Sequence, residues 1–430
     1  MIYLQMELVK LDLRLKSLSK SSEIWWAFQK LSNPTAWLKF GLFAVGLGQS
    51  FAFVLVPPLA RDLGLSVIET STIFSISAIA WAVTSASWGR ASDKYGRRNI
   101  AVIGLIGYSV SIIALITPLF LVEKNVLDLA YLLPLLVLGR LINGLIGSAT
   151  RPAAFAYMAD ITDRSKRTKK FARLESSFLI GTIMGPMIGG FLFLYSKTLP
   201  FYVFALCGGI AAIGILVTFP KTITQKTSEK IISKLSYKDH SVWPFLLLAG
   251  LFSLCQASLL QSIGFFITDV FSSEKDLPLV ISLTFVFLSI STVVSQYIFT
   301  DLKPISNDKL LIYGAFLMCI SYIQAALSTS IALFYLAMMI NGLGSGMVRP
   351  ATASALSLAQ TPDDQGVAAG YLGSVTPIGH ILTPLVAMPI YQYAPEYLYF
   401  FSAFLCFAAL CFIIGHPILR DHEQTSAINS

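Results

Sequence analysis

The sequence RLINGLIGSATRPAA, residues 140–154, decides the fold, because a weaker copy of it, MINGLGSGMVRPAT, occupies residues 339–352. Aligned without a gap, the residues in common are Ile142, Asn143, Gly144, Leu145, Arg151, Pro152, Ala153, Gly181 and Pro186, which match Ile340, Asn341, Gly342, Leu343, Arg349, Pro350, Ala351, Gly379 and Pro384. One register over more than forty residues predicts an internal duplication of a membrane bundle.

The composition is typical of a membrane protein. Of the 430 residues, 55% are hydrophobic and 13% are charged, and the mean hydropathy is +0.71. Soluble domains carry about 25% charged residues, whereas this chain has repeated apolar runs long enough to cross a bilayer core of about 30 Å. The formal net charge of +8 is interpreted as positive charge in cytoplasmic loops rather than as a surface for nucleic acid.

Twelve membrane-spanning helices are predicted, so the fold class is an all-α membrane protein. The spans are expected near residues 38–58, 66–88, 99–121, 129–157, 171–194, 199–219, 242–267, 278–300, 309–328, 331–359, 366–390 and 397–418. A polar, basic segment after the sixth span separates two halves. The predicted domains are an amphipathic cytoplasmic tail (1–38), a six-helix bundle (39–220), a cytoplasmic linker (221–241), a second six-helix bundle (242–418) and a cytoplasmic tail (419–430).

Lysine and arginine are concentrated in the loops on the same side as the N-terminus. These residues are Arg90, Lys94, Arg97, Arg98, Arg164, Lys166, Arg167, Lys169, Lys170, Arg173, Lys221, Lys226, Lys230, Lys234, Lys238, Lys303 and Lys309. The opposite loops carry only Arg61, Lys124, Lys197 and Lys275. Because positive residues are retained on the cytoplasmic side, both termini are predicted to be cytoplasmic.

The sequence GRASDKYGRR, residues 89–98, falls between the second and third spans. Its glycines permit a tight turn, and Asp93 can pair with arginines or with facing helix ends. Charged contacts of this kind can favour one side of a two-state gate. The alternative is an ordinary positively charged loop.

This motif resembles the signature G-x-x-x-D-x-x-G-R-R of the major facilitator superfamily, and the resemblance extends over residues 39–418. The matching residues, predicted to be a gating motif, are Gly89, Asp93, Gly96, Arg97 and Arg98. The resemblance implies two pseudo-symmetric six-helix bundles, and the chain is most like the 12-span proton-coupled multidrug and tetracycline-type exporters. It also implies that the aspartate contacts the second half near span 11 and that Arg97 pairs with Asp160.

Arg140 lies about eleven residues into the fourth span, or roughly 16 Å deep. A guanidinium at that depth costs at least ~2.5 kcal/mol and usually has a function. The sequence around it resembles the superfamily's span-4 motif R-x-x-x-G-x-x-G, whose arginine is linked to proton transfer in exporters. Met338 takes its place in the second copy, so coupling is predicted in the first half. The alternative is an arginine held only by backbone carbonyls.

The fifth span contains GTIMGPMIGG, which matches the G-x-x-x-G-P-x-x-G-G motif of the superfamily's antiporters. Glycines at every fourth position give a smooth face on which another helix can pack closely, and a proline bends the helix. The residues of this motif are Gly181, Gly185, Pro186, Gly189 and Gly190. Importers generally lack the motif, so it favours export. A packing face without directional meaning is the alternative.

Proton coupling needs an ionisable side chain inside the bundle. The predicted proton-coupling residues are Arg140, Glu175 and His380; Glu175 lies early in span 5, and His380 lies in the middle of span 11 and titrates near neutral pH. Structural roles for Glu175 and His380 are equally possible. The predicted substrate-cavity residues, which could equally join helices, are Gln49, Tyr108, Asn143, Gln261 and Asn341.

The resemblance and the span-5 motif predict a secondary active transporter that exports a small organic molecule by alternating access as a proton antiporter. The alternative is an importer or exporter of an anionic or zwitterionic metabolite, such as a carboxylate, amino acid or siderophore. Span 1 contains no acid, which disfavours cationic drugs. An enzyme is disfavoured because hydrolase motifs are missing. We expect no cofactor, no metal and no nucleic-acid partner, and a monomer in the bilayer of a bacterial inner membrane.

Overall fold

The computed structural model describes residues 33–162, 167–219, 235–272, 274, 276–302, 305–361 and 364–419. Within these ranges the chain is helical and contains no strand. Twelve helices there are long and apolar enough to cross a membrane, which agrees with the predicted number of spans. The predicted tail helix and most of the predicted linker lie outside the described residues.

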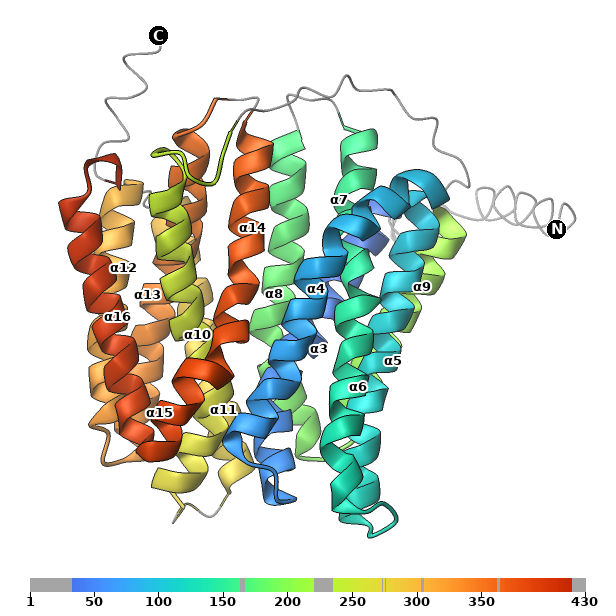
Figure 1. Cartoon of the computed structure of the whole chain (residues 1–430), viewed down its shortest axis with the longest axis vertical. Helices are drawn as coiled ribbons and strands as arrows, with labels where there is room; N and C mark the ends of the chain where they lie inside the picture. The colour runs from blue at the N-terminus through green and yellow to red at the C-terminus, as the bar shows by residue number, and fades with distance from the viewer. Residues whose placement is uncertain are drawn as a thin grey trace, which may run out of the picture.

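The helices form two bundles, with the first half of the chain on the right of Figure 1 and the second half on the left. The first comprises α3 (Pro34–Asp62), α4 (Val67–Tyr95), α5 (Arg97–Glu123), η1 (Leu129–Tyr131), α6 (Leu132–Leu145), η2 (Gly147–Ala149), α7 (Thr150–Asp160), α8 (Arg167–Phe193) and α9 (Leu199–Thr218). The second comprises α10 (Trp243–Val270), α11 (Leu277–Gln296), η4 (Tyr297–Leu302), α12 (Asn307–Ala326), α13 (Ile331–Leu358), α14 (Gln365–Leu382), η5 (Thr383–Ala387), α15 (Met388–Tyr393), α16 (Pro395–Gly415) and η6 (Pro417–Leu419).

Two ends of the bundle are distinguished below. The N-side is the end at which α3 begins, at Pro34, and the far side is the end at which α3 finishes, at Asp62. Successive spans alternate in direction, so α4 and the span made by α6, η2 and α7 run from the far side to the N-side, whereas α8 and α14 run the opposite way (Figure 1).

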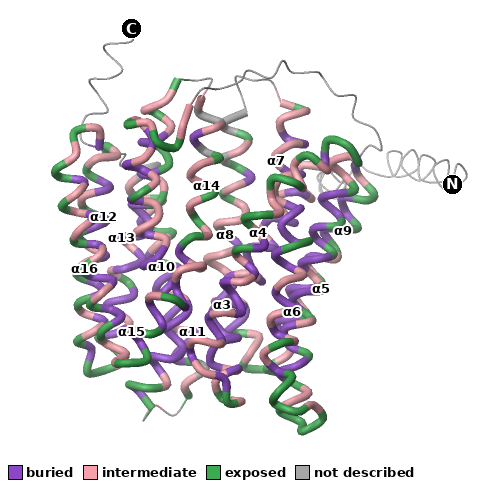
Figure 2. The backbone as a smooth tube through the Cα atoms, viewed as in Figure 1, coloured by how far each residue is buried: buried purple, intermediate pink, exposed green. Residues whose placement is uncertain are grey.

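The outer helices present apolar side chains to their surroundings. Figure 2 shows exposed positions recurring along α16, and its exposed large residues, Tyr397, Phe400, Phe404 and Phe407, follow helical spacing on one face. An apolar face of this kind would be unfavourable in water but suits contact with lipid. The exposed apolar surface therefore supports a membrane-embedded protein.

The internal repeat appears in the packing of glycines. A Cβ atom on Gly181 of α8 would overlap the backbone oxygen of Phe43 on α3. Its counterpart Gly379, on α14, lies equally close to the backbone oxygen of Ser253 on α10. The same pair of helices therefore touches backbone to backbone in both halves, because neither glycine has a side chain to hold the helices apart.

A second pair of glycines repeats the pattern. Gly144 on α6 lies against the backbone oxygen of Ser77 on α4, and Gly342 on α13 lies against the backbone oxygen of Leu288 on α11. An ideal Cβ atom on Gly144 would lie 2.5 Å from the Ser77 oxygen. The register seen in the sequence thus corresponds to equivalent helix contacts, which gives a structural basis for the pseudo-symmetry of the two bundles.

Three local features differ from the predicted spans. The second span does not end before the GRASDKYGRR motif, because α4 continues helically to Tyr95. The fourth span is interrupted by the 3₁₀ turn η2, and the eleventh contains the π-helical turn η5. Such turns occur where the regular hydrogen-bond ladder is disturbed, and η5 begins with Thr383 followed by Pro384, which has no backbone donor.

Candidate functional site

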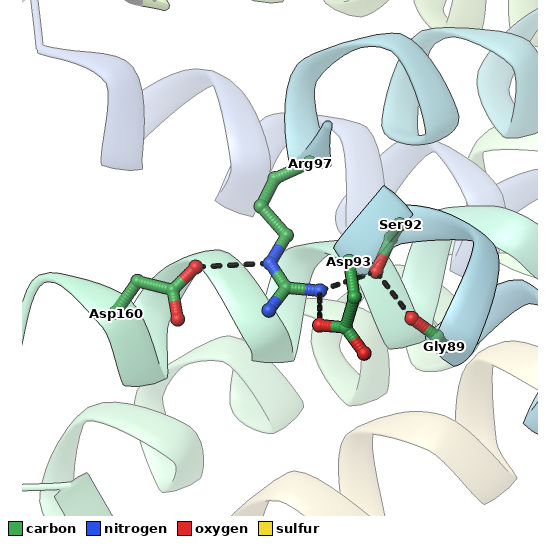
Figure 3. A network of polar contacts seen from close by, with 5 residues as sticks. All are labelled: Gly89, Ser92, Asp93, Arg97 and Asp160. Carbon is green, nitrogen blue, oxygen red and sulfur yellow. Dashed lines mark hydrogen bonds and ion pairs between the residues drawn. The ribbon is translucent and has the colours of Figure 1, made fainter. Parts of the chain in front are cut away.

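The guanidinium of Arg97 is the centre of the polar network of the gating motif (Figure 3). Its Nη1 lies 2.5 Å from Asp93 Oδ1, and its Nε donates a hydrogen bond of 2.9 Å to Asp160 Oδ2. Nη1 also donates to Ser92 Oγ at 2.6 Å, and the Ser92 hydroxyl donates to the Gly89 carbonyl at 2.7 Å. The expected contact between Arg97 and the acid that ends the fourth span is therefore present.

This network joins three helices on the N-side. It links the end of α4, the start of α5 and the end of α7, and only 12% of the Arg97 side chain is exposed. Next to it, Arg98 Nη2 donates to the Leu216 carbonyl of α9 at 2.5 Å. The motif therefore ties the N-side ends of the first bundle together, and Asp93, whose predicted contact is with the second half, contributes an ion pair inside its own half.

The two glycines of the motif have different roles. Gly96 has a φ of +92° and forms the turn between α4 and α5, a conformation that residues with a Cβ rarely adopt. Gly89 lies within α4, and an added Cβ there would have no heavy atom within 4 Å. The prediction that the motif's glycines make a tight turn is therefore correct for Gly96 and wrong for Gly89.

Alanine substitutions should separate these two positions. Gly96→Ala is expected to destabilise the protein by about 1–2 kcal/mol, because it places a Cβ in the left-handed region. Gly89→Ala, the matched control, should be neutral or stabilising by up to about 1 kcal/mol, because alanine favours a helix interior. Thermal unfolding of the purified protein measures both. Equal midpoints for the two variants would contradict the assignment of the turn.

The span-5 glycines pack α8 against α3. A Cβ on Gly185 would overlap Ser50 Oγ and the Leu47 carbonyl, and one on Gly189 would overlap the ring of Phe51. Together with Gly181, these residues form the predicted smooth face, and α8 continues helically through Pro186. Gly190 differs from the others because it lies against Ser282 of α11, in the second bundle.

Arg140 lies inside the first bundle with 2% of its surface exposed. Its Cζ is 5.5 Å from the ring centroid of Phe53 and 5.2 Å from that of Phe74, distances suited to cation–π attraction. Its Nε and Nη1 are buried and have no hydrogen-bond partner among the described residues. The guanidinium is thus held between aromatic rings, without a carboxylate to compensate its charge in the described part of the chain.

Phe53 connects Arg140 to the second bundle. Its ring stacks on the imidazole of His380 at a centroid separation of 4.3 Å. The His380 Nδ1 lies 3.3 Å from Gln261 Nε2, and Gln261 Oε1 accepts a 2.6 Å hydrogen bond from Ser71 Oγ. We call these residues, with Phe74 and Arg140, the central cluster. It brings two of the predicted proton-coupling residues, Arg140 and His380, into contact with one phenyl ring at the interface of the bundles.

The third predicted coupling residue, Glu175, is not in this cluster. Its Oε2 lies 2.5 Å from Arg151 Nη2, on the N-side of the central cluster. The Arg151 guanidinium lies 5.7 Å from the Phe155 ring centroid and 5.4 Å from that of Phe178. Arg349, from α13 of the second bundle, interacts electrostatically with both Glu175 and Arg151. Both repeat-related arginines therefore act electrostatically on the same carboxylate, and of the two only Arg151 forms an ion pair with it in the described residues.

On the far side, an ion pair that the sequence did not suggest joins the bundles. Arg61 at the end of α3 lies 2.8 Å from Asp269 at the end of α10, and the hydroxyl of Tyr391 on α15 donates to the same carboxylate at 2.7 Å. The Arg61 Cζ is also 5.4 Å from the Phe265 ring centroid. These residues lie far apart in the chain, so only the docking of the bundles reveals the contact.

The predicted cavity residues divide into two groups. Gln261 lies at the bundle interface, as expected for that role. Tyr108 is 1% exposed and donates to the Ala44 carbonyl at 2.6 Å, and Asn341 Nδ2 donates to Ser321 Oγ at 2.9 Å, so both join helices within one bundle. Asn143 is 2% exposed, beside Gly147 of the η2 turn.

Gln49 is half-buried, and its Oε1 has no hydrogen-bond partner among the described residues. Its place in the structure therefore does not decide between lining a cavity and joining helices.

Two six-helix bundles with polar and charged contacts at their interface define a transporter-type helical membrane protein. The profile described as Major Facilitator Superfamily matches residues 38–307, and the chain belongs to this superfamily. It is 27% identical over 373 residues to the quinolone resistance protein NorA of Staphylococcus aureus, and the aligned region covers 83% of this chain and 89% of NorA. It is 25% identical over 367 residues to multidrug resistance protein 1 of Bacillus subtilis, covering 84% and 90%.

Solved structures share the fold. The nucleoside transporter NupG superimposes with a TM-score of 0.70 at 14% identity, covering 90% of this chain and all (100%) of NupG. A bacterial homologue of the human lysosomal transporter Spinster, in an inward-facing and occupied conformation, superimposes with a TM-score of 0.65 at 13% identity, covering 91% and 96%. The predicted fold and family are therefore confirmed, and the chain is a transporter of the superfamily rather than an enzyme.

Proposed function

We propose that the protein is a secondary active exporter that expels a small organic molecule in exchange for protons, as a monomer in a bacterial inner membrane. The observation that carries the proposal is the complete glycine face of α8, packed directly on α3, in a chain similar to proteins named for quinolone and multidrug resistance. A small-residue face allows two helices to slide or tilt closely against each other. In this proposal the N-side and both termini face the cytoplasm.

Alternating access is supported by where the bundles touch. The Arg61–Asp269 ion pair and the Ser71–Gln261 hydrogen bond join them on the far side and near the middle. Gly190, near the far-side end of α8, also lies against Ser282 of α11 in the second bundle. We take this state to be closed on the far side, and opening there requires the ion pair to separate.

The central cluster is the proposed place of coupling. The guanidinium of Arg140 repels a second positive charge, and the imidazole of His380 contacts the same Phe53 ring. Protonation of His380 would add a second positive charge at the bundle interface, and movement of the bundles would relieve the repulsion. Glu175 offers a separate carboxylate on the N-side, where its contact with Arg151 would respond to the same movement.

Transport in oriented membranes tests the proposal. Everted vesicles, whose cytoplasmic face is outward, should accumulate a fluorescent quinolone when their interior is acidified, and a protonophore should abolish the accumulation. Vesicles with empty membranes are the control. Accumulation in right-side-out vesicles under an inward proton gradient, without accumulation in everted ones, would establish an importer and reject export.

A further inference from the structure

Arg151 and Arg349, which the repeat relates to each other, lie at equivalent depths in the two bundles. Each precedes the N-side end of its helix, Asp160 for α7 and Leu358 for α13, by the same number of residues. That separation corresponds to more than two helical turns, or roughly 13 Å. The Cα atoms of both arginines therefore lie within the membrane-spanning part of the bundle, where an arginine is costly and is usually retained for a function.

Arg349 faces the interface between the bundles. Its charge interacts with Glu175 and Arg151 of the first bundle and also with His380 on α14 of its own bundle. A side chain turned toward the surrounding lipid would not approach groups on both bundles at once. Arg349 therefore lies between the N-side arginine–glutamate contact and the central cluster.

The charge of Arg349 is not compensated by the residues around it. Glu175 already has an ion pair with Arg151 at 2.5 Å, within its own bundle. Arg349 makes no hydrogen bond and no ion pair with any residue of the described ranges, and its side chain is accessible to solvent. Arg140, in the central cluster and farther from the N-side, is also without a carboxylate partner in the described part of the chain. Among the described residues, these two arginines therefore leave uncompensated positive charge at the interface between the bundles.

We infer that Arg349 binds an anionic group of the transported compound, so that the preferred substrates are organic anions with an apolar or aromatic body; this rests on the proposed transport function. A guanidinium presents a planar set of donors that matches a carboxylate, and an ion pair formed there replaces the missing counter-charge. The Phe155 and Phe178 rings beside Arg151 provide aromatic surface for the body of such a compound. Glu175 would repel an anion if it were free, but Arg151 holds it.

Matched probes of different charge test the inference on the purified full-length protein. We would compare 1-naphthoate with its uncharged amide, 1-naphthamide, and with the cation 1-naphthyltrimethylammonium, measuring equilibrium binding by calorimetry and transport in proteoliposomes. Arg349→Gln should weaken binding of 1-naphthoate about ten-fold or more, because a charge-assisted hydrogen bond is lost. Binding of the amide should change less than about two-fold. The affinity of Arg349→Lys for 1-naphthoate should lie between those of the unaltered protein and Arg349→Gln, because lysine retains the positive charge but lacks the planar pair of donors of the guanidinium group.

The control is Lys124→Gln, which removes the same charge from an exposed far-side position. It should leave all three affinities unchanged. An equal loss for all three probes in Arg349→Gln would indicate a structural role and overturn the inference, as would no binding of 1-naphthoate to the unaltered protein. If the protein transported the cation 1-naphthyltrimethylammonium and Arg349→Gln transported it equally well, the inference would be overturned and the proposed function would be supported. Binding of 1-naphthoate that depends on Arg349, without transport of any probe, would support the inference and reject the proposed function.

Discussion

Replacing Gly181 with leucine is expected to abolish transport and to destabilise the protein by about 3 kcal/mol or more. A Cβ at this position would overlap the Phe43 carbonyl oxygen, and it would lie 3.0 Å from the Leu47 nitrogen. The contact is reciprocal, because a Cβ on Gly46 of α3 would lie 2.9 Å from the Thr182 nitrogen of α8. Backbone atoms cannot rotate away as a side chain can, so the two helices would have to separate.

The matched control is Gly209→Leu on α9. Its Cβ would meet no heavy atom within 4 Å, so the leucine side chain can extend outward and the stability should change by less than about 0.5 kcal/mol. Thermal unfolding of the purified variants and transport in everted vesicles provide the two measurements. If Gly181→Leu behaved like Gly209→Leu in both, the direct packing of α8 on α3 would be disproved.

The sequence predicted the contacts that depend on helix register. The offset between the two copies related Gly144 to Gly342 and Gly181 to Gly379, and each pair makes the same kind of helix contact. Glycines that recur at every fourth position of a spanning helix favour close approach of another helix, so the role of such a series can be predicted from its spacing. The Arg97–Asp160 ion pair was predictable for a different reason, because the resemblance to the superfamily implied that Arg97 pairs with an acid at the end of the fourth span.

Contacts between the bundles could not be predicted in this way. Arg61 and Asp269 both lie at the ends of long apolar runs, where a charged residue normally faces water, and no periodicity relates one to the other. The same holds for Ser71 and Gln261, whose hydrogen bond depends on how the two bundles dock. Of the central cluster, the sequence therefore identified Arg140, Gln261 and His380 singly. It identified neither Phe53, Phe74 and Ser71 nor the arrangement of the cluster around Phe53.

Polar side chains within a span gave the least reliable predictions. Tyr108 was a predicted cavity residue, but its hydroxyl donates to the Ala44 carbonyl and its ring packs beside Gly48 and Gly208. A hydroxyl in hydrocarbon must find an acceptor wherever it lies, so a buried tyrosine looks the same in sequence whether it faces a substrate or a neighbouring helix. Only the direction of the side chain separates the two roles.

Arg140 and Met338 show how the duplicated halves have diverged at one position. Both are fully or almost fully buried, with 2% and 0% of their surface exposed. Methionine satisfies such a site by packing alone, whereas the guanidinium leaves Nε and Nη1 without partners among the described residues. Because unmatched buried donors cost about 1–3 kcal/mol each, an arginine here reduces stability, and its presence is best explained by the transport cycle.

Arg140→Met, which copies the second half into the first, should therefore leave the stability unchanged or raise it by about 1 kcal/mol. Transport should fall to the level of membranes without the protein, because the charge at the central cluster is lost. Arg97→Met is the matched control, since that guanidinium has ion pairs with Asp93 and Asp160, and its loss should reduce stability by about 1–2 kcal/mol. Thermal unfolding and proton-driven transport of each variant separate the two effects. Retained transport in Arg140→Met would contradict a role of Arg140 in coupling. A loss of stability as large as that of Arg97→Met would show that Arg140 supports the fold.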